Sequence, residues 1–387
     1  MSKLRIIVVT LCEPYPFGPA LGRWYYALLK ELSRRQHQVR CLSATTNPQW
    51  AELARDAIKP FEVNLSLYPI SSDSTWLGKK WRTVRRPFSY TLSDGLRTDL
   101  AKEVQSGYDI LHLEQLWAGY LAEGRERSLV AVHHLSSLDL QGLALAFGPQ
   151  FLFERLLTLR AEVRLLRRLT AMATLSDRLA GSIQSINRKA SVFVVPYALD
   201  PSLYQFKADD RSGEPVIGFV ANMKWMPGYL AARRLITAVF PHVKEHVPQA
   251  RLLIAGWNAR QVLSKFVNEP DVMIEENVSD PRPYFDRLQV LAYPVPQGSG
   301  VKVKVLEGMA WGTPVVTTTD GIEGIEAVDG EQCFVADEDV AFAERVVELL
   351  QAADLRRAFR QRARAMIEEQ HSPVPVVNRL ERVYQAL

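Results

Sequence analysis

Short apolar runs rich in β-branched residues alternate along this sequence with longer stretches of helical period, and no other feature constrains the fold as strongly. Such runs are typical of strands buried on both faces, and strands separated by helices pair in parallel. In the first half we predict strands at Ile6–Val9, Val39–Leu42, Asp109–Leu113, Leu129–Val132, Ala171–Leu175 and Val192–Val195. The helices predicted between them include Trp24–Arg35, Leu96–Gln105 and Phe151–Leu169.

The pattern stops at the polar stretch Asp200–Glu214 and then starts again. The strands predicted after this break are Val216–Val220, Leu252–Ala255, Val272–Ile274, Val290–Tyr293 and Val315–Thr318, and the helices include Leu230–His246, Lys302–Trp311 and Val340–Leu350. The sequence therefore predicts an α/β protein with two Rossmann-like parallel-sheet domains, residues 1–200 and 201–370, facing across a cleft. Ligands of such sheets bind at the carboxyl ends of the strands. We expect residues 371–387, which contain a helix-breaking Ser-Pro pair near their start, to pack back on the first domain.

Composition excludes several other classes of protein. Among 387 residues, 47 Lys and Arg stand against 43 Asp and Glu, and a net charge of +4 is too small for a dedicated nucleic-acid binder. Cys12, Cys41 and Cys333 lie far apart, which argues against a disulfide scaffold or a structural zinc site and fits a reducing compartment. No apolar run reaches the roughly 18 residues of a membrane span, and we expect a cytoplasmic protein.

The stretch Gln297–Glu307 carries the most chemical information, because it follows a predicted strand and leads into a predicted helix. Its glycines allow a ligand to approach the backbone closely, and free N–H groups at a helix start attract anions. Lys302 and Lys304 add positive charge, and Glu307 can accept hydrogen bonds from sugar hydroxyls. Two interpretations stay open: a site for a phosphate beside a polyol, or an ordinary helix start with a Lys304–Glu307 surface pair worth roughly a few tenths of a kcal/mol.

The segment Gly298–Ile325, GSGVKVKVLEGMAWGTPVVTTTDGIEGI, resembles family 4 retaining glycosyltransferases of the GT-B fold, in particular the subgroup with a Gly-Ser-Gly-x-Lys/Arg-x-Lys-x-Leu-Glu core. Further matching segments are Gly218–Gly228, Leu252–Asn258 and Val278–Val295, with looser matches at Gly18–Arg23, Tyr108–Glu114 and Val194–Asp200. The resemblance implies a metal-independent, retaining enzyme that moves a hexosyl unit from a nucleoside diphosphate sugar to an acceptor hydroxyl. The acceptor would be a glycan, a lipid-linked glycan or a small molecule, bound by the first domain, while the second domain binds the donor.

The resemblance also implies roles for individual residues. Those at the donor diphosphate would be Gly22, Arg23, Ser299, Gly300, Lys302 and Lys304. Those at the ribose or the donor sugar would be Asn222, Lys224, Glu307 and Glu323. The catalytic residues would be His133, which stabilises charge in the transition state, and Lys302, which holds the leaving diphosphate. Without the resemblance, a lone histidine at a strand end such as His133 is more often structural, and the loop around Glu323 is equally readable as a glycine turn.

The sequence departs from the family pattern at three places. Ser299 stands where the first carboxylate of the family's Glu-x7-Glu motif is expected. Asn222 stands where many members have an arginine, and Pro196-Tyr197-Ala198 replaces a common Pro-Asn-Gly. We therefore expect Lys302 and Lys304 to supply most of the charge that neutralises the diphosphate.

Two charged segments have competing interpretations. Asp337-Glu338-Asp339 superficially resembles a metal-binding DxD motif, but acidic capping of the following helix explains it, and no metal cofactor is expected. The basic segment Lys79–Arg86 is either a solvated loop or a contact for an acidic acceptor or for anionic lipid at a membrane surface. Two other functions also stay open: a nucleotide-sugar epimerase or phosphorylase on the same fold, and a non-catalytic nucleotide-sugar binder.

Overall fold

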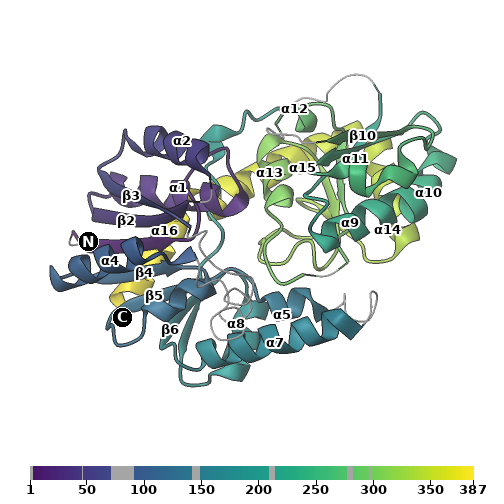
Figure 1. Ribbon diagram of the computed structural model, residues 1–387. Coiled ribbons are helices and arrows are strands. Elements are labelled where there is room, and N and C mark those ends of the chain that lie inside the picture. The colour runs from purple at the N-terminus through teal and green to yellow at the C-terminus, as the bar shows by residue number, and fades with distance from the viewer. Residues whose placement is uncertain are drawn as a thin grey trace. The chain divides into compact units, whose positions relative to one another are not determined.

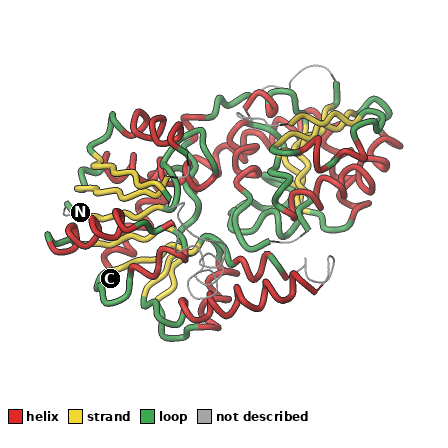
Figure 2. Tube along the Cα trace, viewed as in Figure 1, coloured by secondary structure: helices red, strands yellow, loops and turns green. Residues whose placement is uncertain are grey.

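The computed structural model describes residues 3–45, 47–70, 91–141, 149–208, 214–276, 282–296 and 298–387. The chain forms two compact units, one of Met1–Leu199 with Pro373–Leu387 and one of Asp200–Ser372. Each unit contains one parallel sheet with helices packed against it (Figures 1 and 2).

The sheet of the first unit has seven parallel strands in the order β3-β2-β1-β4-β5-β6-β7. They are β1 (Arg5–Thr10), β2 (Gln38–Thr45), β3 (Val63–Pro69), β4 (Ile110–Glu114), β5 (Ser128–Val132), β6 (Ala171–Thr174) and β7 (Ser191–Val194). The helices are α1 (Ala20–Arg34), α2 (Pro48–Ile58), α4 (Asp94–Gln105), α5 (Ser136–Asp139), α7 (Pro149–Leu166), α8 (Asp177–Ile186) and α16 (Pro373–Gln385). Six of these strands were predicted. The seventh, β3, was missed because it is a half-buried edge strand with alternating side chains rather than a continuous apolar run.

The sheet of the second unit has six parallel strands in the order β10-β9-β8-β11-β12-β13. They are β8 (Val216–Val220), β9 (Arg251–Gly256), β10 (Val272–Glu276), β11 (Val290–Tyr293), β12 (Val315–Thr317) and β13 (Phe334–Val335). The helices are α9 (Met226–Arg234), α10 (Phe240–His246), α11 (Ala259–Val262), α12 (Arg282–Phe285), α13 (Val303–Trp311), α14 (Asp339–Gln351) and α15 (Ala353–Met366). The predicted helix Leu230–His246 contains a π-helical turn at Leu235–Val239, which joins α9 to α10.

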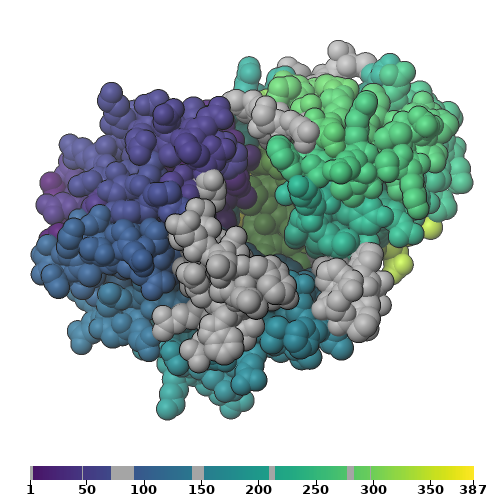
Figure 3. Space-filling view, in the orientation of Figure 1, coloured from purple at the N-terminus to yellow at the C-terminus, as the bar shows by residue number. Residues whose placement is uncertain are grey.

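The last helix, α16, packs in the first unit beside α1, although the two helices lie at opposite ends of the sequence (Figure 1). Ser372 is extended, and Pro373 begins the helix. Glu381 accepts hydrogen bonds from Arg35 Nη1 at 2.6 Å and from the His37 ring at 2.9 Å. On the face of the first unit seen in Figure 3, the purple and blue N-terminal segments form the surface and α16 is hidden.

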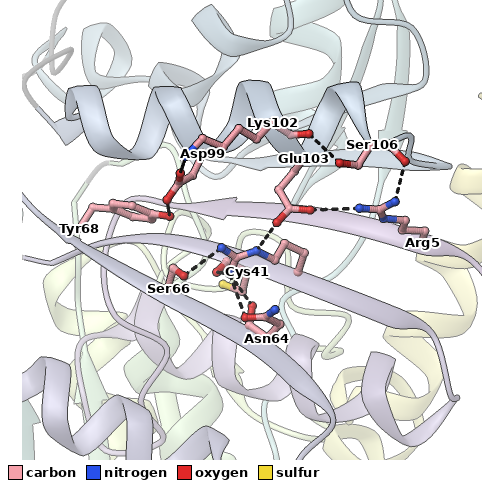
Figure 4. A network of polar contacts seen from close by, with 10 residues as sticks. Arg5, Cys41, Asn64, Ser66, Tyr68, Asp99, Lys102, Glu103 and Ser106 are labelled. Carbon is pink, nitrogen blue, oxygen red and sulfur yellow. Dashed lines mark hydrogen bonds and ion pairs between the residues drawn. The ribbon is translucent and has the colours of Figure 1, made fainter.

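A polar network fastens α4 to the strands β1 to β3 (Figure 4). Glu103 accepts hydrogen bonds from Arg40 Nε at 2.8 Å and from Arg5 Nη2 at 3.1 Å. One turn earlier on α4, Asp99 accepts from the Tyr68 hydroxyl at 2.8 Å. These contacts explain how a helix with few buried residues is held on the edge half of the sheet.

In the parts of the chain that the structure describes, no helix is both long and apolar enough to cross a bilayer. The 18-residue helix α7 carries Arg155, Arg160 and Arg164 along its length.

Candidate functional site

The predicted donor-site residues of the second unit gather at one edge of its sheet. The strand order reverses between β8 and β11, so the loops that follow these two strands flank a switch point, where open α/β sheets bind ligands. Asn222 and Lys224 follow β8, residues 298–304 follow β11, and Glu323 follows β12. Because all of these strands are parallel, their carboxyl ends lie at the same edge of the sheet.

The loop that leads into α13 is closely packed against the unit. Ser299 and Lys302 are both buried, with 4% and 5% of their surface exposed. The Lys302 ammonium group donates a hydrogen bond to the Gly300 carbonyl. At the other end of α13, Gly312 has a φ of +83°, and a Cβ there would lie 2.7 Å from the Lys207 carbonyl oxygen. The glycine therefore allows the helix to end where it does.

Glu307 is buried on the first turns of α13 and has partners on both carboxylate oxygens. Its Oε1 accepts from the Tyr204 hydroxyl at 3.0 Å, and its Oε2 lies 2.6 Å from Lys304 Nζ. The Lys304–Glu307 pair expected at an ordinary helix start is thus present, but only 1% of Glu307 is exposed, so this is not a surface pair. A buried carboxylate must be satisfied by such partners, because its desolvation is costly.

The remaining residues of this edge differ in exposure. Asn222 and Lys224 are exposed, and Asn222 Oδ1 accepts a hydrogen bond from the Lys224 backbone N–H at 3.0 Å, which shapes the loop after β8. Glu323, in the loop after β12, is buried, with 9% of its surface exposed.

The acidic segment Asp337–Asp339 at the start of α14 provides no side-chain cap, so that part of the capping interpretation was wrong, although Asp339 does lie in the first turn of the helix. Glu338 stands at the cap position without a side-chain cap hydrogen bond. Asp337 accepts from the Thr319 backbone N–H at 2.9 Å, and Asp339 lies 2.5 Å from Arg234 Nε. Among the described residues, no group of three or more His, Cys, Asp or Glu side chains could hold a metal ion.

In the first unit, the strand order reverses between β1 and β4, and a buried carboxylate ends β4. Glu114 Oε2 lies 2.6 Å from His133 Nε2, directly after β5, and Glu114 Oε1 accepts from Trp24 Nε1 at 2.8 Å. His112 Nε2 lies 3.2 Å from Glu114 Oε1, and His112 Nδ1 lies 2.6 Å from the Tyr384 hydroxyl. We call these five buried residues the Glu114 cluster.

The charge of Glu114 is decided by two opposing effects. Burial raises its pKa, but the nearby charge of His112 and the charge and hydrogen bond of His133 together lower it more, and the pKa of Glu114 falls well below its usual range. Glu114 is therefore ionised at neutral pH. A small pocket on the same side of the unit is lined by Trp24, His112, His133 and Thr174, among others, so His133 stands at the wall of a cavity.

Gly22 and Arg23 lie on the first turn of α1, which follows β1. A Cβ at Gly22 would lie 2.6 Å from the Glu13 carbonyl oxygen, so only glycine fits. Arg23 Nε donates to the Gly18 carbonyl at 2.8 Å, which anchors the guanidinium group on the loop after β1. The predicted basic segment Lys79–Arg86 lies outside the described residues.

Sequence reasoning did not single out Glu114, Trp24 or Tyr384 as site residues. The one signal available was a charged residue at the end of the apolar run Asp109–Leu113, since a carboxylate next to a buried strand requires partners.

Comparisons with known proteins agree with this architecture. Residues 214–352 match the family model described as glycosyl transferases group 1. A curated relative from Klebsiella pneumoniae, described as an uncharacterized 44.6 kDa protein in the cps region, is 30% identical over 159 residues. That match covers 38% of this chain and 40% of the relative.

Two solved structures are similar over almost the whole chain. Sucrose-phosphate synthase from Thermosynechococcus elongatus superposes with a TM-score of 0.71 at 15% identity, covering 99% of this chain and 98% of that one. HepE from Anabaena, solved with UDP and glucose, superposes with a TM-score of 0.66 at 14% identity, covering 99% and 100%. The chain therefore has the GT-B fold, as predicted, and most of its second unit matches the group 1 glycosyltransferase model.

Proposed function

We propose that this protein is a retaining, metal-independent glycosyltransferase that moves a hexosyl unit from a nucleoside diphosphate sugar to an acceptor hydroxyl. The observation that carries the proposal is the position of the Lys302–Glu307 segment. It lies at the switch point of the sheet in the unit that matches the group 1 glycosyltransferase family.

In this proposal the second unit binds the donor. The backbone amides of Ser299 and Gly300 and the ammonium groups of Lys302 and Lys304 bind the diphosphate, since amides at a helix start favour anions. Glu307, whose carboxylate accepts from Tyr204 and Lys304, accepts hydrogen bonds from the ribose hydroxyls. Asn222, Lys224 and Glu323 complete the binding of the donor from the neighbouring loops.

The first unit binds the acceptor and supplies His133 to the donor sugar, with Gly22 and Arg23 acting on the diphosphate. The fixed positive charge of the lysines stabilises the leaving diphosphate in the transition state. The lysines thus neutralise the diphosphate in place of a metal ion. The diphosphate oxygen then takes the proton of the acceptor hydroxyl on the same face of the sugar, and the anomeric configuration is retained.

Two of the comparisons bear on the substrates. HepE was solved with UDP and glucose, which supports a uridine diphosphate hexose as the first donor to test. The Klebsiella relative is described as a protein of the cps region, which supports a glycan acceptor in polysaccharide biosynthesis. We also propose that the enzyme works in the cytoplasm, in keeping with three free cysteines, of which Cys41 and Cys333 have pKa values raised to about 12 by burial.

The test is an assay of nucleotide release from a panel of UDP-, GDP- and dTDP-sugars, with glycan acceptors, in EDTA. We expect acceptor-dependent release from one donor, with EDTA without effect and an α-anomeric product from an α-linked donor by NMR. A strict Mn²⁺ requirement would contradict the metal-independent mechanism, and donor conversion without any acceptor would favour an epimerase. Nucleotide binding without turnover of any donor would favour a non-catalytic binder.

A further inference from the structure

A line of close polar contacts runs through the Glu114 cluster, from the last helix of the chain to His133, with hydrogen bonds at its two ends and an ion-pair distance between His112 and Glu114. The Tyr384 hydroxyl on α16 lies 2.6 Å from His112 Nδ1, His112 Nε2 lies 3.2 Å from Glu114 Oε1, and Glu114 Oε2 lies 2.6 Å from His133 Nε2. Tyr384 and Glu114 have no exposed surface, and His112 is 1% exposed. Three of the five members lie in the interior, and only Trp24 and His133 reach a few per cent exposure.

The chemistry of these contacts places a proton on one nitrogen of His133. An ionised carboxylate can only accept hydrogen bonds. His133 Nε2 therefore carries a proton and donates a hydrogen bond to Glu114. In the neutral ring, Nδ1 is then the atom with the free lone pair. Trp24 Nε1, which can only donate, holds the other oxygen of the same carboxylate at 2.8 Å. Both oxygens of Glu114 therefore accept hydrogen bonds from ring N–H groups.

A cluster of this kind is a poor way to gain stability, because well-packed apolar residues in place of a buried ionic group are often equally stable. Its position supports another role. It lies at the carboxyl ends of β4 and β5, where a parallel sheet presents ligands to its loops, and it borders the pocket that His133 lines.

We propose that Glu114 is a positioning residue that sets the orientation and the tautomer of His133 for glycosyl transfer, and that Tyr384 supports it through His112. The proposal rests on the proposed function, because it takes His133 as the residue that acts at the donor sugar. It makes α16, the last helix of the chain, a working part of the acceptor-binding unit rather than a tail that covers it.

The substitution Glu114→Gln tests the tautomer directly in the full-length protein. The Trp24 N–H can only donate, so the new amide turns its oxygen toward Trp24 and its NH₂ group toward His133 Nε2. His133 must then accept at Nε2 and carry its proton on Nδ1. We expect ¹⁵N NMR of histidine-labelled protein to show the Nε2–H tautomer of His133 in the wild type and the Nδ1–H tautomer in Glu114→Gln.

The kinetic signature follows from the same change. We expect kcat for transfer to fall by about a hundredfold or more in Glu114→Gln, as for other histidines held in the wrong tautomer, with the donor KM within about twofold of wild type. Glu114→Asp keeps a carboxylate. It should therefore keep the Nε2–H tautomer of His133 and most of the wild-type kcat. Tyr384→Phe removes one supporting hydrogen bond and should lower kcat by roughly threefold to tenfold.

Tyr68→Phe is the matched control, because it removes a tyrosine hydroxyl from the same unit outside the cluster, and kcat should be unchanged. An Nδ1–H tautomer of His133 in the wild type would overturn the proposal, as would unchanged kcat in a folded Glu114→Gln protein. The NMR readout needs no substrate. If no donor is turned over at all, the proposed function fails, while the tautomer still decides whether Glu114 positions His133.

Discussion

The two units share one architecture, a parallel sheet with a switch point, yet they place charge at that point in opposite ways. The second unit has lysines and backbone amides beside a buried carboxylate on one loop and helix. The first unit buries an ionised carboxylate between two histidines and an indole. One arrangement suits the binding of an anion, and the other suits the control of a proton. The comparison predicts that changes in the second unit alter nucleotide binding, while changes in the first alter turnover.

The largest effect should come from Lys302→Ala. Loss of a charged group that stabilises the leaving diphosphate should lower kcat/KM for transfer by about 10²- to 10³-fold. The matched control is Lys244→Ala, because Lys244 pairs with Asp271 at the amino end of β10, the opposite edge of the same sheet. Equal activity of the two variants in steady-state assays would show that Lys302 has no role in transfer.

His133→Ala should lower kcat by about a hundredfold, within the range of single groups that stabilise or transfer charge in a reaction. The donor nucleotide should bind as tightly as in the wild type, since His133 is proposed to act at the donor sugar and not at the diphosphate or the ribose. Calorimetry and initial rates measured on the same preparation separate these effects. A loss of nucleotide affinity as large as the loss of rate would break the division between the units.

Glu114→Gln should also lower the free energy of unfolding, by about 2 kcal/mol at neutral pH, because it removes a buried hydrogen-bonded charge. The folded pKa of Glu114 is depressed below the 4.5 of an unfolded glutamate, so its stabilisation is full above pH 4.5 and is lost as the pH falls. At about pH 3.5 the difference from wild type should shrink by about 1.4 kcal/mol. Urea unfolding at both pH values measures this, and an unchanged difference would mean that Glu114 is not ionised in the folded protein.

The smallest effect concerns the attachment of α16. Arg35→Ala breaks the ion pair between Arg35 and Glu381, in which the Arg35 side chain is 17% exposed and the Glu381 side chain 8%. This change should lower the free energy of unfolding by about 1 kcal/mol. Lys102→Ala breaks the exposed pair with Asp99 and should change it by less than about 0.5 kcal/mol. If the two variants have the same stability in parallel urea titrations, the contact between Arg35 and α16 does not contribute to the stability of the first unit.

The sequence pointed to the candidate donor-site residues of the second unit but not to most of the Glu114 cluster of the first unit, and the reason is physical. Ser299, Lys302 and Glu307 lie within nine consecutive residues, so their spacing on one loop and helix can be read directly. The Glu114 cluster is assembled from β4, β5, α1 and α16, and His112 and Tyr384 are 272 positions apart. Only the sheet order and the return of the last helix bring them together. Local periodicity likewise predicted the buried strands, but missed β3 and β13, whose exposure or length leaves no apolar run.

The most direct test of the central claim is a calorimetric titration of UDP, GDP and dTDP into wild-type protein, Lys302→Ala and Lys244→Ala, all in EDTA. We expect one nucleotide to bind the wild type without metal, Lys244→Ala to bind it equally well, and Lys302→Ala to bind it at least tenfold more weakly. If no nucleotide binds the wild type, or if Lys302→Ala binds as tightly as Lys244→Ala, the loop before α13 is not the donor site.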